Sequence, residues 1–123
     1  MVYAAIGRAA PGVMPWATKD GPASFLYTRE TARQGSAYHA RMFASAWGVI
    51  EDPATGSAAA AFAGIVQAFE RPRDGEHMLI LEQGFEMGRP SLIALGLVVE
   101  NGAVTSATIG GSVVIVSNGS LDL

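Results

Sequence analysis

EDPATGSAAAAFAGIVQAF, residues 51–69, is the most informative part of this chain. Within it, residues 56–69 carry only two polar side chains, Ser57 and Gln67. A helix over these fourteen residues is about 21 Å long at a rise of about 1.5 Å per residue, which is too short to cross a bilayer. Because a helix that is apolar all round belongs in a protein interior, we expect the rest of the domain to surround it.

The sequence around this helix is typical of β-strands. Runs rich in β-branched and aromatic residues predict strands at residues 24–29, 37–43, 78–81, 92–100, 103–109 and 112–116. Asn101-Gly102 lies between two of these runs and predicts a tight hairpin, since a type I′ turn needs positive φ at both central positions. We therefore expect an α+β fold in which a curved, mostly antiparallel sheet wraps around one buried central helix.

Two further local patterns predict where elements of secondary structure end. Residues 2–10 are predicted to form a short helix that ends before Pro11, because the residue before a proline disfavours helical geometry. Gly110-Gly111 predicts another sharp connection or a bulge after the strand at residues 103–109. No change of composition marks a linker, so residues 1–123 are expected to form a single domain.

The composition argues against several classes of function. The 123 residues have a formal net charge of −3 and no cysteine, which excludes disulfides, thiolate nucleophiles and cysteine-ligated metals. His39 and His77 belong to no spaced ligand set, so no metal is predicted. Eight lysines and arginines without a basic run argue against nucleic-acid binding. No run approaches the ~20 apolar residues of a membrane span, and no export signal is evident, so we expect a cytoplasmic protein.

The residues before the central helix fit two roles. Asp52 is a favoured N-cap residue and Pro53 suits the first helical position, so an ordinary helix start explains both. Gly56 then follows in the first turn, where glycine costs about 1 kcal/mol relative to alanine but lets a ligand approach the backbone. Because the first N–H groups of a helix have no intrahelical partners, Thr55, Gly56 and Ser57 can hold a carboxylate or a phosphate. Both roles stay open for Asp52.

Nucleotide binding of the usual kinds is not supported by this helix start. A P-loop needs a lysine before its serine or threonine, and no lysine occurs within residues 51–69. The three spaced glycines of a dinucleotide-binding fingerprint are also missing here. The predicted ligand is therefore a small anion rather than a nucleotide.

Two segments carry a resemblance to a known family. RMFASAWGVIEDPATGSAAAA, residues 41–61, and QGFEMGRPS, residues 83–91, closely resemble the C-terminal half of the phenazine biosynthesis-like (PhzF-like) isomerases, which are relatives of diaminopimelate epimerase. The resemblance covers about residues 24–119. It implies a diaminopimelate epimerase-like fold, in which two similar domains each wrap a curved sheet around a central helix, with the active site in the cleft between them.

The resemblance also implies an activity and roles for four residues. The family moves a proton between carbons of a small carboxylated substrate, without a metal or an organic cofactor. By position in the motif, Asp52 matches the acidic side chain that faces the substrate and is the catalytic candidate. Thr55, Gly56 and Ser57 match the turn that binds the substrate carboxylate.

The same resemblance predicts that this chain needs a partner. The glutamate that shuttles the proton lies in the N-terminal domain of these isomerases, which this chain does not match. We expect the site to be completed by a complementary N-terminal domain or by pairing in a homodimer. Ser45 stands where the family commonly has proline. The alternative function is a noncatalytic domain that binds carboxylates or another protein.

The neighbouring polar residues are predicted to have structural roles. Glu51 is expected to face solvent or the helix dipole, because adjacent acids seldom point into one site. His39 is expected to be a hydrogen-bonding residue, although its strand position beside Arg41 also leaves a catalytic role open. Arg41 is expected to pair with an acid, while Glu86 and Arg89 are expected to order the loop that they share.

Overall fold

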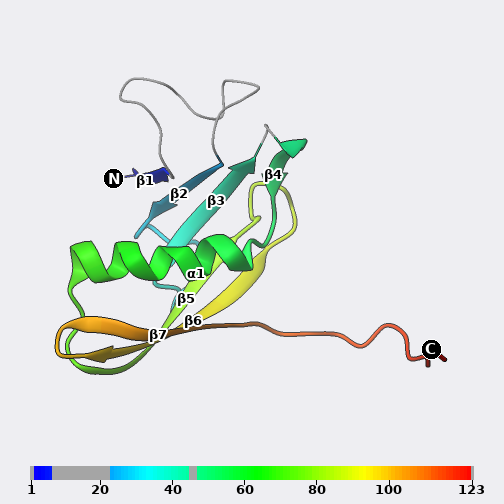
Figure 1. The fold of residues 1–123 in the computed structure, drawn as a ribbon. Coiled ribbons are helices and arrows are strands. Elements are labelled where there is room, and N and C mark those ends of the chain that lie inside the picture. Colours follow the sequence, from blue (N-terminus) through cyan, green and yellow to red (C-terminus); the bar gives the residue numbers. More distant parts are fainter. Residues whose placement is uncertain (1, 7–22, 45–46, 123) are drawn as a thin grey trace.

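The computed structural model describes residues 2–6, 23–44 and 47–122, with residues 2–6 described as backbone only. These residues form one sheet, in the order β1-β2-β3-β5-β6-β7 with β4 paired to β3, and one long helix (Figure 1). The strands are β1 (Val2–Ile6), β2 (Ser24–Thr28), β3 (Tyr38–Ala44), β4 (Val49–Asp52), β5 (Gly75–Gln83), β6 (Ser91–Glu100) and β7 (Ala103–Gly110). The helix α1 (Gly56–Ile65) continues into a π-helical turn, η3 (Val66–Glu70).

The strand pairing follows from the connections. Each described pair is antiparallel except β3 with β5, which run parallel. Parallel neighbours need a crossover, and here the chain passes through β4, α1 and η3 between them. The predicted hairpin between β6 and β7 is confirmed, because Asn101 and Gly102 have φ of 53° and 72°. The Asp74 carboxylate accepts the N–H groups of both residues, at 2.9 and 2.8 Å.

The core lies between one face of the helix and the sheet. Phe62 of α1 is 2% exposed and packs edge-on or tilted against three rings of β2 and β3. Its ring centroid lies 4.6 Å from that of Tyr27, 4.9 Å from that of Tyr38 and 5.7 Å from that of Phe25. Aromatic pairs prefer such arrangements at these separations. The helix is thereby fixed across the strands that carry the candidate site (Figure 1).

The predicted fold class is confirmed, with one difference in how the helix is covered. The curved, mostly antiparallel sheet packs against a single helix, as expected. The helix is covered on one side only: Ser57, Ala61, Gly64 and Ala68 recur at helical spacing and are all exposed. The described sheet is one layer and reaches only one face of α1, so no strand in that part of the chain covers the other face.

Three local predictions are wrong. Val2–Ile6 forms strand β1 instead of a helix, because it pairs with β2 along its whole length; residues 7–10 lie outside the described part. Residues 112–116 do not form a strand, and residues 111–122 run away from the sheet without regular structure (Figure 1). Gly110-Gly111 is no sharp turn, since neither glycine has positive φ. A strand needs an edge to pair with, and the tail meets none in the described part of the chain.

No helix of the described residues is both long and apolar enough to cross a membrane. Ser45, where the family commonly has proline, lies outside the described residues.

Candidate functional site

The turn between β4 and α1 differs from the predicted helix start. Asp52 is the last residue of β4 and pairs with Met42 of β3, and the helix begins only at Gly56. The N-cap residue is Thr55, with φ −108° and ψ 88°, and no side chain caps the helix there. The prediction of Asp52 as N-cap and Pro53 as first helical residue is therefore wrong. The pairing of β4 with β3 keeps Asp52 extended and delays the helix.

The side chain of a buried glutamine holds this turn in place. We call its hydrogen bonds to Asp52 and Thr55 the brace. Gln83, at the end of β5, is fully buried, and its Oε1 accepts the Thr55 N–H at 3.2 Å. Its Nε2 donates to the Asp52 carbonyl at 2.5 Å and to the Thr55 hydroxyl at 3.0 Å. The Thr55 hydroxyl in turn donates to Asp52 Oδ2 at 2.5 Å. Since these bonds occupy the Thr55 hydroxyl, it leaves the first N–H groups of α1 uncapped.

The loop after Gln83 packs against the same turn. Gly84 has φ of 78°, and a Cβ on it would lie 2.8 Å from the Pro53 carbonyl oxygen and 2.4 Å from that of Arg89. Only glycine fits this close approach. The Arg89 N–H donates to the Gly84 carbonyl at 2.9 Å, which closes the loop on itself. The turn before α1 is therefore held by both β5 and the loop that follows it.

The helix start opens into a cavity of about 530 Å³. Its lining includes Ala54 and Gly56 from the helix start, Ser91 from β6, Ile109 and Gly110 from the end of β7, and Arg33. A Cβ on Gly56 would meet Ile109 at 3.6 Å, an ordinary contact, so this position has room for alanine, and a branched side chain would extend further toward Ile109 or into the cavity. An uncapped helix start facing a cavity with an arginine in its wall is suited to an anion.

The structure brings some of the predicted site residues together and leaves others apart. Asp52 and Thr55 are joined to each other and to Gln83, and Gly56 lines the cavity. Ser57 lies exposed in the first turn, and neither Ser57 nor Asp52 is among the residues that line the cavity. Sequence reasoning missed Gln83 and Arg33. Apart from Gln83 opening the family-like segment, no local signal pointed to either, because Gln83 reaches the site from the end of β5 and Arg33 from the connection between β2 and β3.

A charged network adjoins the brace. His39 of β3 lies between two acids: its Nδ1 is 2.7 Å from Glu82 Oε1 and its Nε2 is 2.7 Å from Glu86 Oε1. Because carboxylates only accept, this placement favours the doubly protonated ring, in which both nitrogens donate. Burial lowers the pKa of His39, but the hydrogen bonds to Glu82 and Glu86 outweigh it and raise the pKa above its ordinary value. His39 is thus a hydrogen-bonding residue, as predicted.

The two acids are held in their charged form. Burial would raise the pKa of Glu82, but the N–H of Ala32, the ring of His39 and the N–H of Arg33 lower it below its ordinary value. The Glu82 side chain is fully buried, with these N–H groups 2.5 and 3.1 Å from its oxygens. The pKa of Glu86 is also lowered, since its bond to His39 outweighs its burial. Glu86 thereby ties the loop after β5 to β3.

Arg41 completes the network, and it pairs with an acid as predicted. Its Nε and Nη2 donate to the two carboxylate oxygens of Glu51 at 2.8 and 2.9 Å, a bidentate pair. The Glu51 side chain is only 13% exposed, so the prediction that it faces solvent or the helix dipole is wrong. The arginine across from it on β3 draws it toward the sheet. These charges position β4 and the loop and do not line the cavity.

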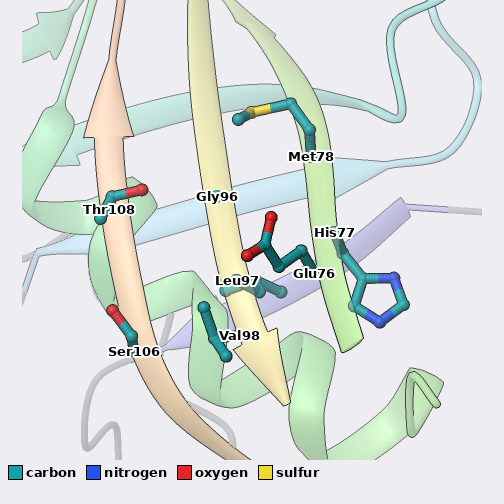
Figure 2. A pocket seen from close by; sticks show the side chains of 8 residues that line it. All are labelled: Glu76, His77, Met78, Gly96, Leu97, Val98, Ser106 and Thr108. Carbon is teal, nitrogen blue, oxygen red and sulfur yellow. The ribbon is translucent and has the colours of Figure 1, made fainter. Parts of the chain in front are cut away.

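A second hollow, of about 460 Å³, lies on the other face of the sheet. Figure 2 shows Glu76 and Met78 of β5 facing Ser106 and Thr108 of β7 across Gly96. It holds no helix start and no arginine, so it lacks the features that suit an anion. Within the described residues no group of three or more histidines and acids is placed to hold a metal ion.

Comparisons with known proteins agree with these features. The model of the phenazine biosynthesis-like protein family matches residues 6–119. An uncharacterized isomerase of Mesorhizobium japonicum is 49% identical over 112 residues, which cover 91% of this chain and 36% of that protein. The trans-2,3-dihydro-3-hydroxyanthranilate isomerase of Pseudomonas chlororaphis is 45% identical over 62 residues, covering 50% of this chain and 22% of that enzyme.

A solved structure is similar as well. The crystal structure of a Bacillus anthracis phenazine biosynthesis protein of the PhzF family superposes with a TM-score of 0.54 at 26% identity. The alignment covers 70% of this chain and 32% of that one. This chain therefore spans only about a third, or less, of the length of the proteins that it matches.

Proposed function

The chain belongs to the phenazine biosynthesis-like (PhzF) family, and we propose that it is one half of an isomerase. The proposed reaction moves a proton between carbons of a small carboxylated substrate and uses no metal or organic cofactor. The isomerase relatives support the reaction class. The observation that carries the proposal is the uncapped start of α1 at Gly56, which opens into the cavity.

The substrate carboxylate is proposed to bind at this helix start. Free N–H groups and the positive end of the helix dipole stabilise an anion there. Gly56 gives the carboxylate access to the backbone, with Thr55 before it and Ser57 after it in the turn. Arg33 lines the same cavity, and its guanidinium is proposed to supply a positive charge there. Both contributions are electrostatic and preorganised, since the brace by Gln83 fixes the turn before any ligand arrives.

Asp52 is the proposed acid–base residue of this half. A carboxyl group serves as both general base and general acid when its surroundings match its pKa to the working pH. Asp52 is half-buried beside the helix start, and its Oδ2 accepts the Thr55 hydroxyl. In the complete enzyme it would face the substrate from this side. A second half would supply the opposite acid, as in the isomerases that the sequence resembles.

The second half is proposed to be a complementary N-terminal domain or a second copy of this chain. The longer relatives contain about twice as much further chain as the part matched here. The exposed face of α1 is a surface that such a partner would cover. In this proposal the partner supplies the acid that opposes Asp52.

Deuterium exchange tests the enzyme proposal. The chain is incubated in D2O with trans-2,3-dihydro-3-hydroxyanthranilate, alone and mixed with the N-terminal part of the Mesorhizobium relative. We expect deuterium at a substrate carbon, detected by mass spectrometry, and its loss in Gly56→Val. Gly119→Val is the matched control, because Gly119 is exposed, lies outside α1 and the cavity lining, and has nothing within 4 Å of a Cβ. No exchange in a complex of verified mass would contradict the catalytic role.

A noncatalytic carboxylate-binding domain is the second candidate. The observation that favours it is that Asp52 is engaged by Thr55 and does not line the cavity. It predicts that a small carboxylate such as benzoate shifts the amide NMR signals of Gly56 and Ser57, that Gly56→Val abolishes the shift, and that no proton exchange occurs with any partner. Exchange of substrate protons by any assembly of this chain would exclude it.

A further inference from the structure

Gln83 carries a fully buried amide, and its three hydrogen bonds all reach the turn before α1. Its Oε1 accepts the Thr55 N–H, and its Nε2 donates to the Asp52 carbonyl. These two partners fix which end of the amide is nitrogen, since a reversed amide would place NH2 against an N–H and oxygen against a carbonyl. The second N–H of Nε2 donates to the Thr55 hydroxyl oxygen at 3.0 Å. Gln83 is therefore a donor, and not an acceptor, toward this hydroxyl.

The Thr55 hydroxyl can donate only one hydrogen bond, and Gln83 limits where it goes. A hydroxyl has a single O–H, which rotates to suit its surroundings, and two lone pairs that accept. Because Gln83 Nε2 donates to the hydroxyl oxygen, the hydroxyl cannot donate back to it. The acceptor that the hydroxyl meets in the described part of the chain is Asp52 Oδ2, at 2.5 Å. Donation therefore runs in one direction, from Gln83 through Thr55 to Asp52.

The two carboxylate oxygens of Asp52 are thereby made unequal. Oδ2 accepts the Thr55 hydroxyl, whereas Oδ1 has no hydrogen bond to any residue that the structure describes. A proton on Oδ2 would leave the Thr55 O–H without its acceptor, and a polar group that loses its partner costs free energy. A proton on Oδ1 disturbs none of these bonds. The network therefore favours Oδ1 as the oxygen that carries a proton.

We propose that Gln83 is a positioning residue for the isomerase reaction: it directs the Thr55 hydroxyl to Asp52 Oδ2, so that Oδ1 is the atom that exchanges a proton with the substrate. As a base, Oδ1 takes a proton from a substrate carbon, and the electron pair of the broken C–H bond stays on the substrate. As an acid, Oδ1 returns a proton to a substrate carbon. This role rests on the proposed function, whereas the direction of the hydrogen bonds rests on these three residues alone.

The same bonds separate the role of Thr55 from that of the residues after it. Its N–H is bonded to Gln83 Oε1, its hydroxyl to Asp52, and its carbonyl accepts the Ala59 N–H at 3.0 Å. Its polar groups are thus already engaged inside the chain. The substrate carboxylate is left with the first N–H groups of the helix, those of Gly56 and Ser57. Thr55 therefore acts on the acid–base residue, and Gly56 and Ser57 act on the carboxylate.

NMR of the chain alone tests the direction of the hydroxyl. A hydroxyl proton that is held in a hydrogen bond exchanges slowly with water and gives a signal at low temperature. We expect such a signal from Thr55, with a cross-peak to the Gln83 side-chain amide, and its loss in Gln83→Leu, where the hydroxyl is free to rotate. Gln67→Leu is the control, since it removes an amide from η3 and should keep the signal. No signal in the parent chain, or a signal that persists in Gln83→Leu, overturns the proposal.

Kinetics of deuterium exchange test the role in the reaction, in the complex with the N-terminal part of the Mesorhizobium relative. Thr55→Val keeps the branched shape and removes the hydroxyl. It should lower kcat about ten- to hundredfold, because a carboxyl group that can rotate spends less time in the productive geometry. KM should stay unchanged, since the helix start that holds the substrate carboxylate is intact. Thr55→Ser keeps the hydroxyl and should restore most of the rate.

A double-variant cycle shows whether Gln83 acts through Thr55. Gln83→Leu should lower kcat in the parent chain and have much less effect in Thr55→Val, because residues that act through one network are not additive. Additive losses, or a normal kcat in Thr55→Val, overturn the positioning role while leaving the isomerase proposal intact. A parent complex that exchanges no substrate proton overturns the proposed function, and the positioning role with it. The NMR result on the hydroxyl stands apart from that outcome.

Discussion

The two long faces of α1 have similar composition and opposite surroundings. One face carries Phe62 and Ala63, which are 2% and 5% exposed against the sheet. The other carries Ser57, Ala61 and Gly64, which are all exposed. The hydrophobic content of a helix does not by itself show how many of its sides are covered by the rest of the chain. The uncovered face and the open start of the helix lie on one element, so whatever covers the face is near enough to complete the site.

The largest expected effect comes from shortening a side chain on the buried face of α1. Phe62→Ala should lower the free energy of unfolding by about 3–5 kcal/mol, because it leaves a cavity among the rings of Tyr27 and Tyr38. Phe69→Ala, at a position 75% exposed, should change it by less than about 0.5 kcal/mol. Urea denaturation of both variants measures the difference. A large loss in Phe69→Ala would show that the exposed side chain of Phe69, in η3, is covered in solution.

The brace behind the helix start gives the next effect. Gln83→Leu should cost about 1–3 kcal/mol, because it leaves the Thr55 N–H and the Asp52 carbonyl without their buried partner. Gln67→Leu removes only one hydrogen bond, from Nε2 to the Gly102 carbonyl, and also a buried Oε1 that has no partner, so it should cost less. Thermal unfolding compares the two. Equal costs would mean that Gln83 contributes no more than the single bond of Gln67, and that another contact holds the turn.

The features that the sequence predicted most accurately are those that depend on residues adjacent in the chain. The hairpin at Asn101-Gly102 and the alanine-rich helix rest on local backbone chemistry, and both are present. The N-cap lies three residues later than predicted, at Thr55 instead of Asp52, because the pairing of Asp52 with Met42 overrides the cap signal. The strand predicted at residues 112–116 has the right composition but no edge to join.

The site was harder to predict than the fold. The sequence motif identified Gly56 and its turn. Gln83 lies 28 residues from Thr55 in the chain and reaches it only because β5 pairs with β3 in parallel. Arg33 joins the cavity wall from a connection whose course no periodicity predicts. Local patterns thus identify an anion-binding turn, while the residues that brace and charge it depend on sheet register.

The pH dependence tests the network that ties β3 to the site loop. The pKa of His39 is raised above its ordinary 6.5, so its contribution is complete below that pH and is lost as pH rises through the folded-state pKa. The pKa values of Glu82 and Glu86 are lowered, so their contribution is complete above about 4.5 and is lost at lower pH. Stability should therefore be greatest between these values.

Unfolding by urea across pH 5–9 measures this profile. His39→Gln should remove the loss of stability on the alkaline side, because the titrating ring is gone. His77→Gln is the control and should keep that loss, since His77 bonds only the Arg73 carbonyl among the described residues. A profile that stays unchanged in His39→Gln would show that another group sets the alkaline limit.

The smallest effect returns to the exposed face of α1. Gly64 has helical geometry, is exposed, and has nothing within 4 Å of a Cβ, so Gly64→Ala should stabilise the chain by about 0.5–1 kcal/mol. The gain should appear in urea denaturation at micromolar concentration. If a second copy or domain packs closely over this face, an added methyl group would meet it, and the gain would shrink or reverse as the chain concentration rises. A concentration-independent gain would mean that this face of α1 stays open to solvent.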